Sequence, residues 1–191
     1  MFCVASFDVG ILNFAFTVLR ITANQAPKVL VWRNVCLGSS KSSLSNIIQM
    51  MVRLLEEEEH MADVSKVVIE RQPPNNVKLR ALSHAIETYF VTRTAITPSK
   101  HTDVFFFDAR SKSKLQVEGI PAVDLSCNYR QRKQRSIECA SEIVEAYFPG
   151  WSDMFSKSSK QDDLADCFIQ ALAFVQTTTD LCLTGTEPPQ K

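Results

Sequence analysis

The sequence is poor in the residues that several common functional sites require. Its 191 residues include only five glycines, and its six cysteines form neither a CxxC pair nor a Cys/His cluster at zinc-ligand spacing. A glycine-rich phosphate-binding loop, a structural zinc site and a dense disulfide framework are therefore not indicated. No apolar run reaches the roughly 18 residues of a membrane span, and no basic segment precedes the first run. We expect a soluble, unsecreted, intracellular protein with reduced thiols.

The chain also lacks an excess of either charge. Lysine plus arginine and aspartate plus glutamate number 21 each, so the total charge predicts no polyanionic partner. The charges are unevenly placed, however, with an acidic run at 56–59 and a basic region at 110–135. A hydrophobic fraction of 45% and a charged fraction of 22% are typical of a globular protein. We expect one domain over residues 1–178 and a flexible C-terminal tail over 179–191.

The spacing of apolar residues predicts an α/β fold with a mixed sheet. Three early strands with short connections, which indicate an antiparallel meander, are expected at 2–7, 13–21 and 28–35. Two later strands are expected at 65–71 and 103–109. Helices are expected at 42–59, 76–94, 130–148 and 160–176. The resulting order, β-β-β-α-β-α-β-α-α, predicts a five-stranded sheet covered by helices.

Two carboxylates stand where a charge is costly. Asp8 ends the apolar run of SFDVGILNFAF, and Glu70 ends the apolar strand VVIE. A carboxylate at the end of a buried strand must be solvated, hydrogen-bonded or bound to a cation. Each residue alone would fit a simple strand end at the solvent boundary, but the pair suggests a shared explanation.

A third group of acids lies in KQDDLADCF, at residues 160–168, near the start of the last helix. At 100° per residue, Asp162 lies roughly 40° and Asp163 roughly 60° from Asp166 around the helix. The alternative is a favourable first turn, since acids suit a helix N-terminus and Ser159 with Asp162 resembles a capping arrangement. That alternative accounts for Asp162 and Asp163 but hardly for Asp166, one turn further along.

These acids have the chemistry of a magnesium site. Clustered carboxylates repel one another unless a cation neutralises them, and hard oxygen ligands are what Mg²⁺ prefers. Two strand-end acids and the helix group suffice for two ions. Two ions about 3.5–4 Å apart activate a water molecule and stabilise the leaving oxygen in phosphodiester cleavage.

Three motifs, in this order and at these separations, carry a resemblance. SFDVGILNFAF, VVIERQPPNN and KQDDLADCFIQAL resemble the RuvC-type Holliday junction resolvases of the ribonuclease H-like superfamily. The likeness is greatest to the resolvases of poxviruses and other large DNA viruses and to the fungal mitochondrial cruciform-cutting endonucleases. It spans residues 3–176. The DxG of the first motif also opens actin-like ATPases, but this chain is too short for the two domains of such an enzyme.

The resemblance implies a five-stranded ribonuclease H-like sheet and a symmetric homodimer. It also implies Mg²⁺- or Mn²⁺-dependent nicking of opposed strands in a four-way DNA junction, which leaves 5′-phosphate ends. Asp8 resembles the first metal ligand of the family, and Glu70 the acid that binds or bridges the metals. The viral resemblance favours Asp163 with Asp166 as the final pair. Helical geometry and the mitochondrial spacing favour Asp162, so both remain candidates.

Basic residues are the second part of the resemblance. Some family members place a lysine after the fifth strand, and DARSKSKL offers Lys112, preferred by its position, and Lys114. Ordinary solvated lysines are the alternative. The residues expected to contact DNA phosphates are Arg71, Lys78, Lys112, Lys114, Arg130, Arg132, Lys133 and Arg135. For the last four, in YRQRKQR, the alternative is a solvated basic start of a helix.

Several alternatives stay open at this point. The enzyme could act on other branched DNA or on structured RNA, and a module that binds junctions without cutting would retain the same sheet. Helix 76–94 is a candidate dimer surface, although its apolar stripe more simply belongs to the core. A viral source would place the protein in recombination or replication of viral DNA, in the host cytoplasm or nucleus rather than the mitochondrion.

Overall fold

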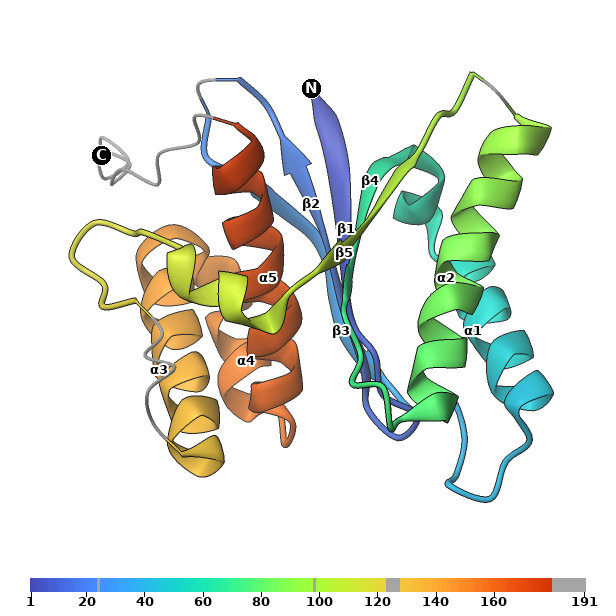
Figure 1. The fold of residues 1–191 in the computed structure, drawn as a ribbon. Helices are drawn as coiled ribbons and strands as arrows, with labels where there is room; N and C mark the ends of the chain where they lie inside the picture. The colour runs from blue at the N-terminus through green and yellow to red at the C-terminus, as the bar shows by residue number, and fades with distance from the viewer. Residues whose placement is uncertain (24, 98, 123–127, 180–191) are drawn as a thin grey trace.

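A five-stranded sheet stands between two layers of helices in the computed structural model, which describes residues 1–23, 25–97, 99–122 and 128–179 (Figure 1). The strands are β1 (Phe2–Asp8), β2 (Phe14–Ile21), β3 (Lys28–Val35), β4 (Val64–Glu70) and β5 (Asp103–Phe107). The helices are α1 (Leu44–Glu57), α2 (Val77–Ile96), α3 (Tyr129–Tyr147), α4 (Ser152–Lys157) and α5 (Gln161–Thr178). Apart from Thr179, the tail expected at 179–191 lies outside the described residues.

The sheet has the strand order β3-β2-β1-β4-β5. Strands β1, β2 and β3 pair antiparallel, whereas β4 pairs parallel to β1 and β5 parallel to β4. The predicted mixed sheet with its antiparallel meander is therefore confirmed. The predicted order of the elements also holds, with the additions of α4 and of three short 3₁₀ helices, η1 (Glu59–Asp63), η2 (Ala109–Lys114) and η3 (Pro149–Trp151). The basic stretch after β5 begins with η2.

Alternation along the strands divides the core into two parts. Ala5 and Phe7 of β1 pack on the side of α1 and α2, whereas Val4 packs on the side of α3, α4 and α5. Because successive side chains of a strand point to opposite faces, Asp8 belongs to the α5 side. Leu82 and Ile86 of α2 are fully buried, so the apolar stripe of the predicted helix 76–94 is mainly core.

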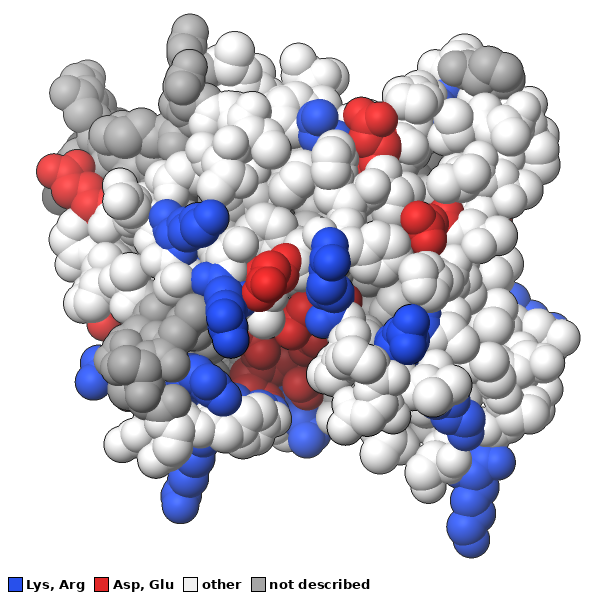
Figure 2. Space-filling model, in the orientation of Figure 1, with Lys and Arg blue, Asp and Glu red and all other residues white. Residues whose placement is uncertain are grey.

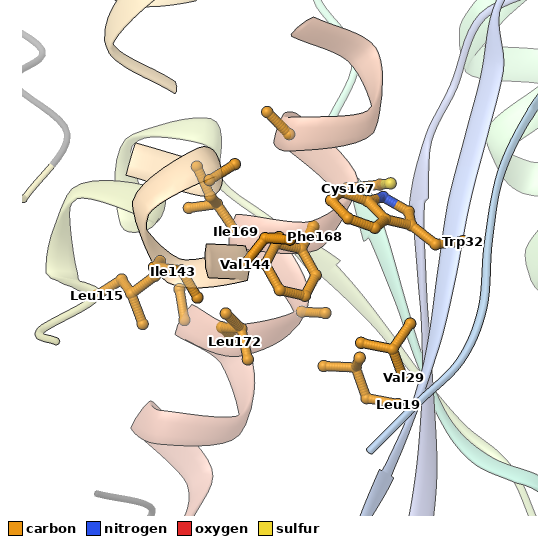
Figure 3. Packing of buried hydrophobic residues seen from close by; sticks show 14 of the residues in the cluster. Leu19, Val29, Trp32, Leu115, Ile143, Val144, Cys167, Phe168, Ile169 and Leu172 are labelled. Carbon is orange, nitrogen blue, oxygen red and sulfur yellow. The ribbon is translucent and has the colours of Figure 1, made fainter. Parts of the chain in front are cut away.

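Helix α5 is held firmly between the sheet and α3 (Figure 3). The ring of Trp32 on β3 lies 4.6 Å from that of Phe168 on α5 and 5.0 Å from that of Phe155 on α4, between centroids. Its indole Nε1 donates a hydrogen bond of 3.0 Å to the carbonyl oxygen of Leu164. This bond ties the first turn of α5 to β3.

The turn after Asp8 requires a glycine. A Cβ atom at Gly10 would lie 2.2 Å from the carbonyl oxygen of Asn13, which no side chain can tolerate. Gly10 therefore lets the backbone reverse immediately after the strand-end carboxylate and enter β2.

Two broader expectations can be compared with the described part of the chain. Its cysteines, which are Cys3, Cys36, Cys139 and Cys167, are all free thiols. Within the described ranges, no helix combines the length and the apolar character that crossing a bilayer requires.

Candidate active site

The two strand-end carboxylates lie side by side. In the parallel pairing of β1 with β4, Ser6 is opposite Val68 and Phe7 is opposite Ile69, so Asp8 and Glu70 follow at the same edge of the sheet. Val68 packs on the α5 side, and Glu70, two residues later, shares its face. Both carboxylates therefore point toward α5 from the two central strands.

Helix α5 supplies the other acids from its N-terminal half. Asp163 and Asp166 are three positions apart (i, i+3), which places them on one face of the helix. Lys160 occupies the N-cap position and makes no side-chain capping bond, so the alternative in which Ser159 caps this helix is wrong. The charges that act on Asp8 include those of Glu70, Asp166 and Asp163. Four carboxylates from three elements thus form one cluster.

Lys112 of η2 lies inside this cluster. Its Nζ donates to Oε2 of Glu70 at 2.7 Å and lies 3.3 Å from Oδ1 of Asp166, and its side chain is only 7% exposed. Burial opposes the charge of the lysine, but Asp166, Glu70 and Asp8 outweigh that effect and raise its pKa. The alternative of an ordinary solvated lysine is therefore wrong for Lys112. Lys114, two residues along η2, is exposed.

One ammonium group does not balance four carboxylates. Burial, followed by the like charge of Glu70, raises the pKa of Asp8 well above its usual range, although Lys112 acts in the opposite direction. Burial and the adjacent charge of Asp162 also raise the pKa of Asp163. The Oδ2 atom of Asp163 is buried without a hydrogen-bond partner. The cluster therefore has an excess of negative charge and an unsatisfied oxygen.

Asp162 is turned away from this cluster. Its carboxylate forms an ion pair with Lys133 of α3, and the Nζ of that lysine lies 5.1 Å from the centre of the Tyr129 ring. Although burial acts against it, the hydrogen bond from Lys133 lowers the pKa of Asp162. The largest charge effects on Asp8 come from Glu70, Lys112, Asp166 and Asp163. The structure therefore groups Asp163, rather than Asp162, with Asp166 and the two strand acids.

The donor set fits a hard divalent cation. All four candidate ligands offer carboxylate oxygens. The oxygen of Asp163 without a hydrogen-bond partner and the excess negative charge both favour a bound cation. As they stand, no three acidic, histidine or cysteine side chains of the described ranges are gathered closely enough to hold one ion. In this arrangement the ammonium of Lys112 lies between Glu70 and Asp166.

Positive side chains surround the acids on the surface. Figure 2 shows acidic atoms recessed in a hollow on this face, with lysine and arginine side chains around it. Several of the predicted DNA contacts have exposed side chains, namely Arg71, Lys114, Arg130, Arg132 and Arg135. Lys78 is occupied instead, because its Nζ donates to the carbonyl oxygens of Ser40 at 3.1 Å and Ser42 at 2.9 Å. Lys133 is occupied by Asp162.

Sequence reasoning missed one polar residue behind the site. Gln170 of α5 is fully buried, and its Nε2 bonds to residues of β1 and β4. The available signal was its spacing, since it lies four residues after Asp166 on the same helical face. A glutamine at an otherwise apolar position of a buried helix indicates a polar contact with the sheet.

Comparison with solved structures gives the same fold. The fowlpox virus resolvase in complex with Holliday junction DNA matches with a TM-score of 0.64 and 18% identity, over 92% of this chain and 98% of that one. The yeast mitochondrial Holliday junction resolvase Ydc2 matches with a TM-score of 0.59 and 12% identity, over 91% and 78% of the respective chains. RuvC of Thermus thermophilus with a Holliday junction substrate gives 0.58 and 13%, over 92% and 96%.

Comparison by sequence alone is less sensitive at such low identity. No curated protein matches the chain significantly. A family model, which weights each position separately, does match. It describes the poxvirus A22 protein and covers residues 2–178, from the start of β1 to the end of α5. The protein therefore belongs to the poxvirus A22 family.

Proposed function

We propose that this protein is a structure-selective endonuclease that resolves four-way DNA junctions by cutting opposed strands. The observation that carries the proposal is the convergence of four carboxylates from β1, β4 and α5 at one edge of the sheet. It stands in a fold that matches solved Holliday junction resolvases. The nuclease domain would comprise residues 1–178, and 5′-phosphate ends would result.

The cofactor would be Mg²⁺, two ions per site, with Mn²⁺ able to substitute. Asp8, Glu70, Asp163 and Asp166 would hold the ions through their carboxylate oxygens. When bound, such a pair activates a water molecule for attack on the phosphodiester and stabilises the leaving oxygen.

Lys112 would have two roles at different times. Before cations bind, its ammonium neutralises Glu70 and Asp166. With those carboxylate oxygens holding cations, the ammonium of Lys112 would be available to neutralise charge on the phosphate being cut. A buried lysine at this position thus serves both the empty and the working site.

DNA would be held by exposed basic residues, which are Arg71, next to Glu70 in the sequence, Lys114 on η2, and Arg130, Arg132 and Arg135 on α3. Such phosphate contacts predict binding that weakens steeply with salt. Lys78 and Lys133 would join them only after leaving their present partners.

Two copies would be needed to cut two opposed strands, and we propose a homodimer. Exposed apolar side chains on α2, which are Val77, Val91 and Ile96, make this helix the candidate contact. Sedimentation at micromolar concentration tests the oligomeric state. Membership of a poxvirus family points to viral DNA inside the host cell as the setting.

Resolution of a synthetic four-way junction tests the proposal. We expect paired nicks in opposed strands with Mg²⁺ or Mn²⁺ and none in EDTA. Gel electrophoresis detects the nicks, and ligation of the products tests for 5′-phosphate ends. Matched flap, duplex and RNA–DNA substrates should be cut far less. Equal cutting of flaps or structured RNA would identify a nuclease with another substrate, and metal-independent binding without cutting would indicate a binding module.

The choice between Asp162 and Asp163 has its own test. Asp163→Asn is expected to lower the cleavage rate by about 10²-fold or more, as removal of a key electrostatic group does. Asp162→Asn should cost less than tenfold, because it only releases Lys133. Single-turnover cleavage of the junction measures both variants. The reverse ranking would place Asp162 among the ligands.

A further inference from the structure

One buried side chain links the three elements that carry the acids. Gln170 on α5 is fully buried, and its Nε2 donates to the Ser6 hydroxyl at 3.0 Å, the Phe7 carbonyl at 3.2 Å and the Val68 carbonyl at 3.4 Å. The first two acceptors belong to β1 and the third to β4. The amide thus lies across the seam between the two central strands.

These acceptors adjoin the strand-end acids. The Phe7 carbonyl belongs to the peptide unit that joins Phe7 to Asp8, and Val68 is two residues before Glu70. On α5, Gln170 lies four residues after Asp166 and seven after Asp163, which places all three on one helical face. The bonds therefore fix where the helix acids stand relative to the strand acids.

We infer that Gln170 is a positioning residue that sets the separation between the helix-borne and the strand-borne carboxylates. This inference rests on the proposed metal-dependent function of the site. The apolar contacts along α5 are nondirectional, and the bond from Trp32 to Leu164 ties α5 to β3 rather than to the two strands that carry Asp8 and Glu70. Hydrogen bonds from one amide to both strands are directional and define a register.

The amide is also poorly suited to a purely stabilising role. Its Oε1 atom is buried without a hydrogen-bond partner, which costs free energy that an apolar side chain of the same length would avoid. Methionine has nearly the same volume and no donor. A residue kept only for packing would need none of these polar atoms, because methionine fills a similar volume.

The test compares Gln170→Met with Leu172→Met, a volume-conserving change of a fully buried residue on the same helix. Mn²⁺ affinity is measured by calorimetry, and the fold by circular dichroism and thermal melting without metal. We expect Gln170→Met to weaken Mn²⁺ binding by about 10- to 100-fold, the usual effect of losing a group that orients metal ligands. Leu172→Met should leave the affinity unchanged, whatever its melting temperature.

Junction cutting supplies a second readout. Gln170→Met should lower the single-turnover rate while the dissociation constant for the junction in EDTA stays at the wild-type value. Ser6→Ala removes the nearest acceptor without altering α5, and roughly a two- to fivefold loss of Mn²⁺ affinity is expected, as for one neutral hydrogen bond. If Gln170→Met does not fold, the Mn²⁺ affinity of Ser6→Ala tests the inference instead.

Wild-type Mn²⁺ affinity in both Gln170→Met and Ser6→Ala would overturn the inference. So would a loss that Leu172→Met reproduces. Failure of the proposed function looks different, because a wild-type protein that binds Mn²⁺ but cuts no junction would still permit the affinity comparison.

Discussion

Asp8→Asn is expected to abolish cleavage of a four-way junction in Mg²⁺ and, at neutral pH without metal, to make the protein more stable. Cleavage is lost because an amide is a weaker, neutral ligand for Mg²⁺. Stability rises because Asp8 stands beside Glu70, Asp163 and Asp166, and one lysine does not balance these charges. Binding of the junction itself should persist.

The gain in stability should depend on pH. Burial and Glu70 raise the pKa of Asp8 in the folded protein, whereas in the unfolded chain the pKa is about 3.9. The folded wild type therefore binds this proton more tightly than the unfolded chain does, and its stability falls as pH rises from about 4 toward the folded pKa. The asparagine variant has no such proton, so its advantage should be absent in acid and grow toward neutral pH.

Thermal melting between pH 4 and pH 8 in EDTA measures this difference, at roughly 2–4 °C for each kcal/mol of relieved repulsion. Asp153→Asn is a suitable control, since Asp153 is an exposed acid on α4 that pairs only with Lys157 in an i,i+4 arrangement. It should change neither melting nor cleavage. Retained cleavage by Asp8→Asn would remove Asp8 from the proposed site, and a variant less stable than the wild type at pH 8 would contradict the excess of negative charge.

Lys112→Met should act in the opposite direction on stability. Removal of one partner from a buried ion pair typically costs 3–5 kcal/mol, and because Glu70 and Asp166 are 20% and 27% exposed we expect the lower end, about 3 kcal/mol. The remaining carboxylates would then lack any fixed cation. Mg²⁺ or Mn²⁺ should restore much of the loss, because the ions would bind the oxygens that the lysine has vacated.

Urea denaturation in EDTA and in Mg²⁺ measures this effect. Lys157→Met, which breaks an exposed ion pair, is the control and should cost little in either buffer. The cleavage rate of Lys112→Met should also fall by about 10²-fold if the ammonium stabilises charge on the phosphate. A variant that is as stable as the wild type in EDTA would contradict the role of Lys112 as a counter-ion.

Local patterns in the sequence were sufficient to predict the sheet and the strand-end positions of Asp8 and Glu70. Apolar runs located all five strands, and helical periodicity located α1, α2, α3 and α5. The position of Asp8 and Glu70 at strand ends follows from the same runs, because a carboxylate is costly inside a strand that is covered on both faces. The helix α4 was missed since six residues are too few to display a period.

The remainder depends on contacts between distant segments. Asp162 forms an ion pair with Lys133 instead of joining the cluster. Lys133 lies on another helix, so this pair forms only when α3 and α5 pack together. Lys112 is buried because Glu70 and Asp166 surround it, whereas its neighbours in the sequence suggest a solvated lysine. The polar role of Gln170 depends on Ser6, which lies 164 positions away in the chain.

That long separation has a consequence for how the protein is made. Strand β1 emerges from the ribosome before helix α5, so no growing chain that lacks α5 can join Asp8 to Asp163 and Asp166. The same helix completes one of the two cores, so folding of that side and assembly of the proposed metal site both require α5. A nascent or prematurely ended chain would thus be unable to cut DNA.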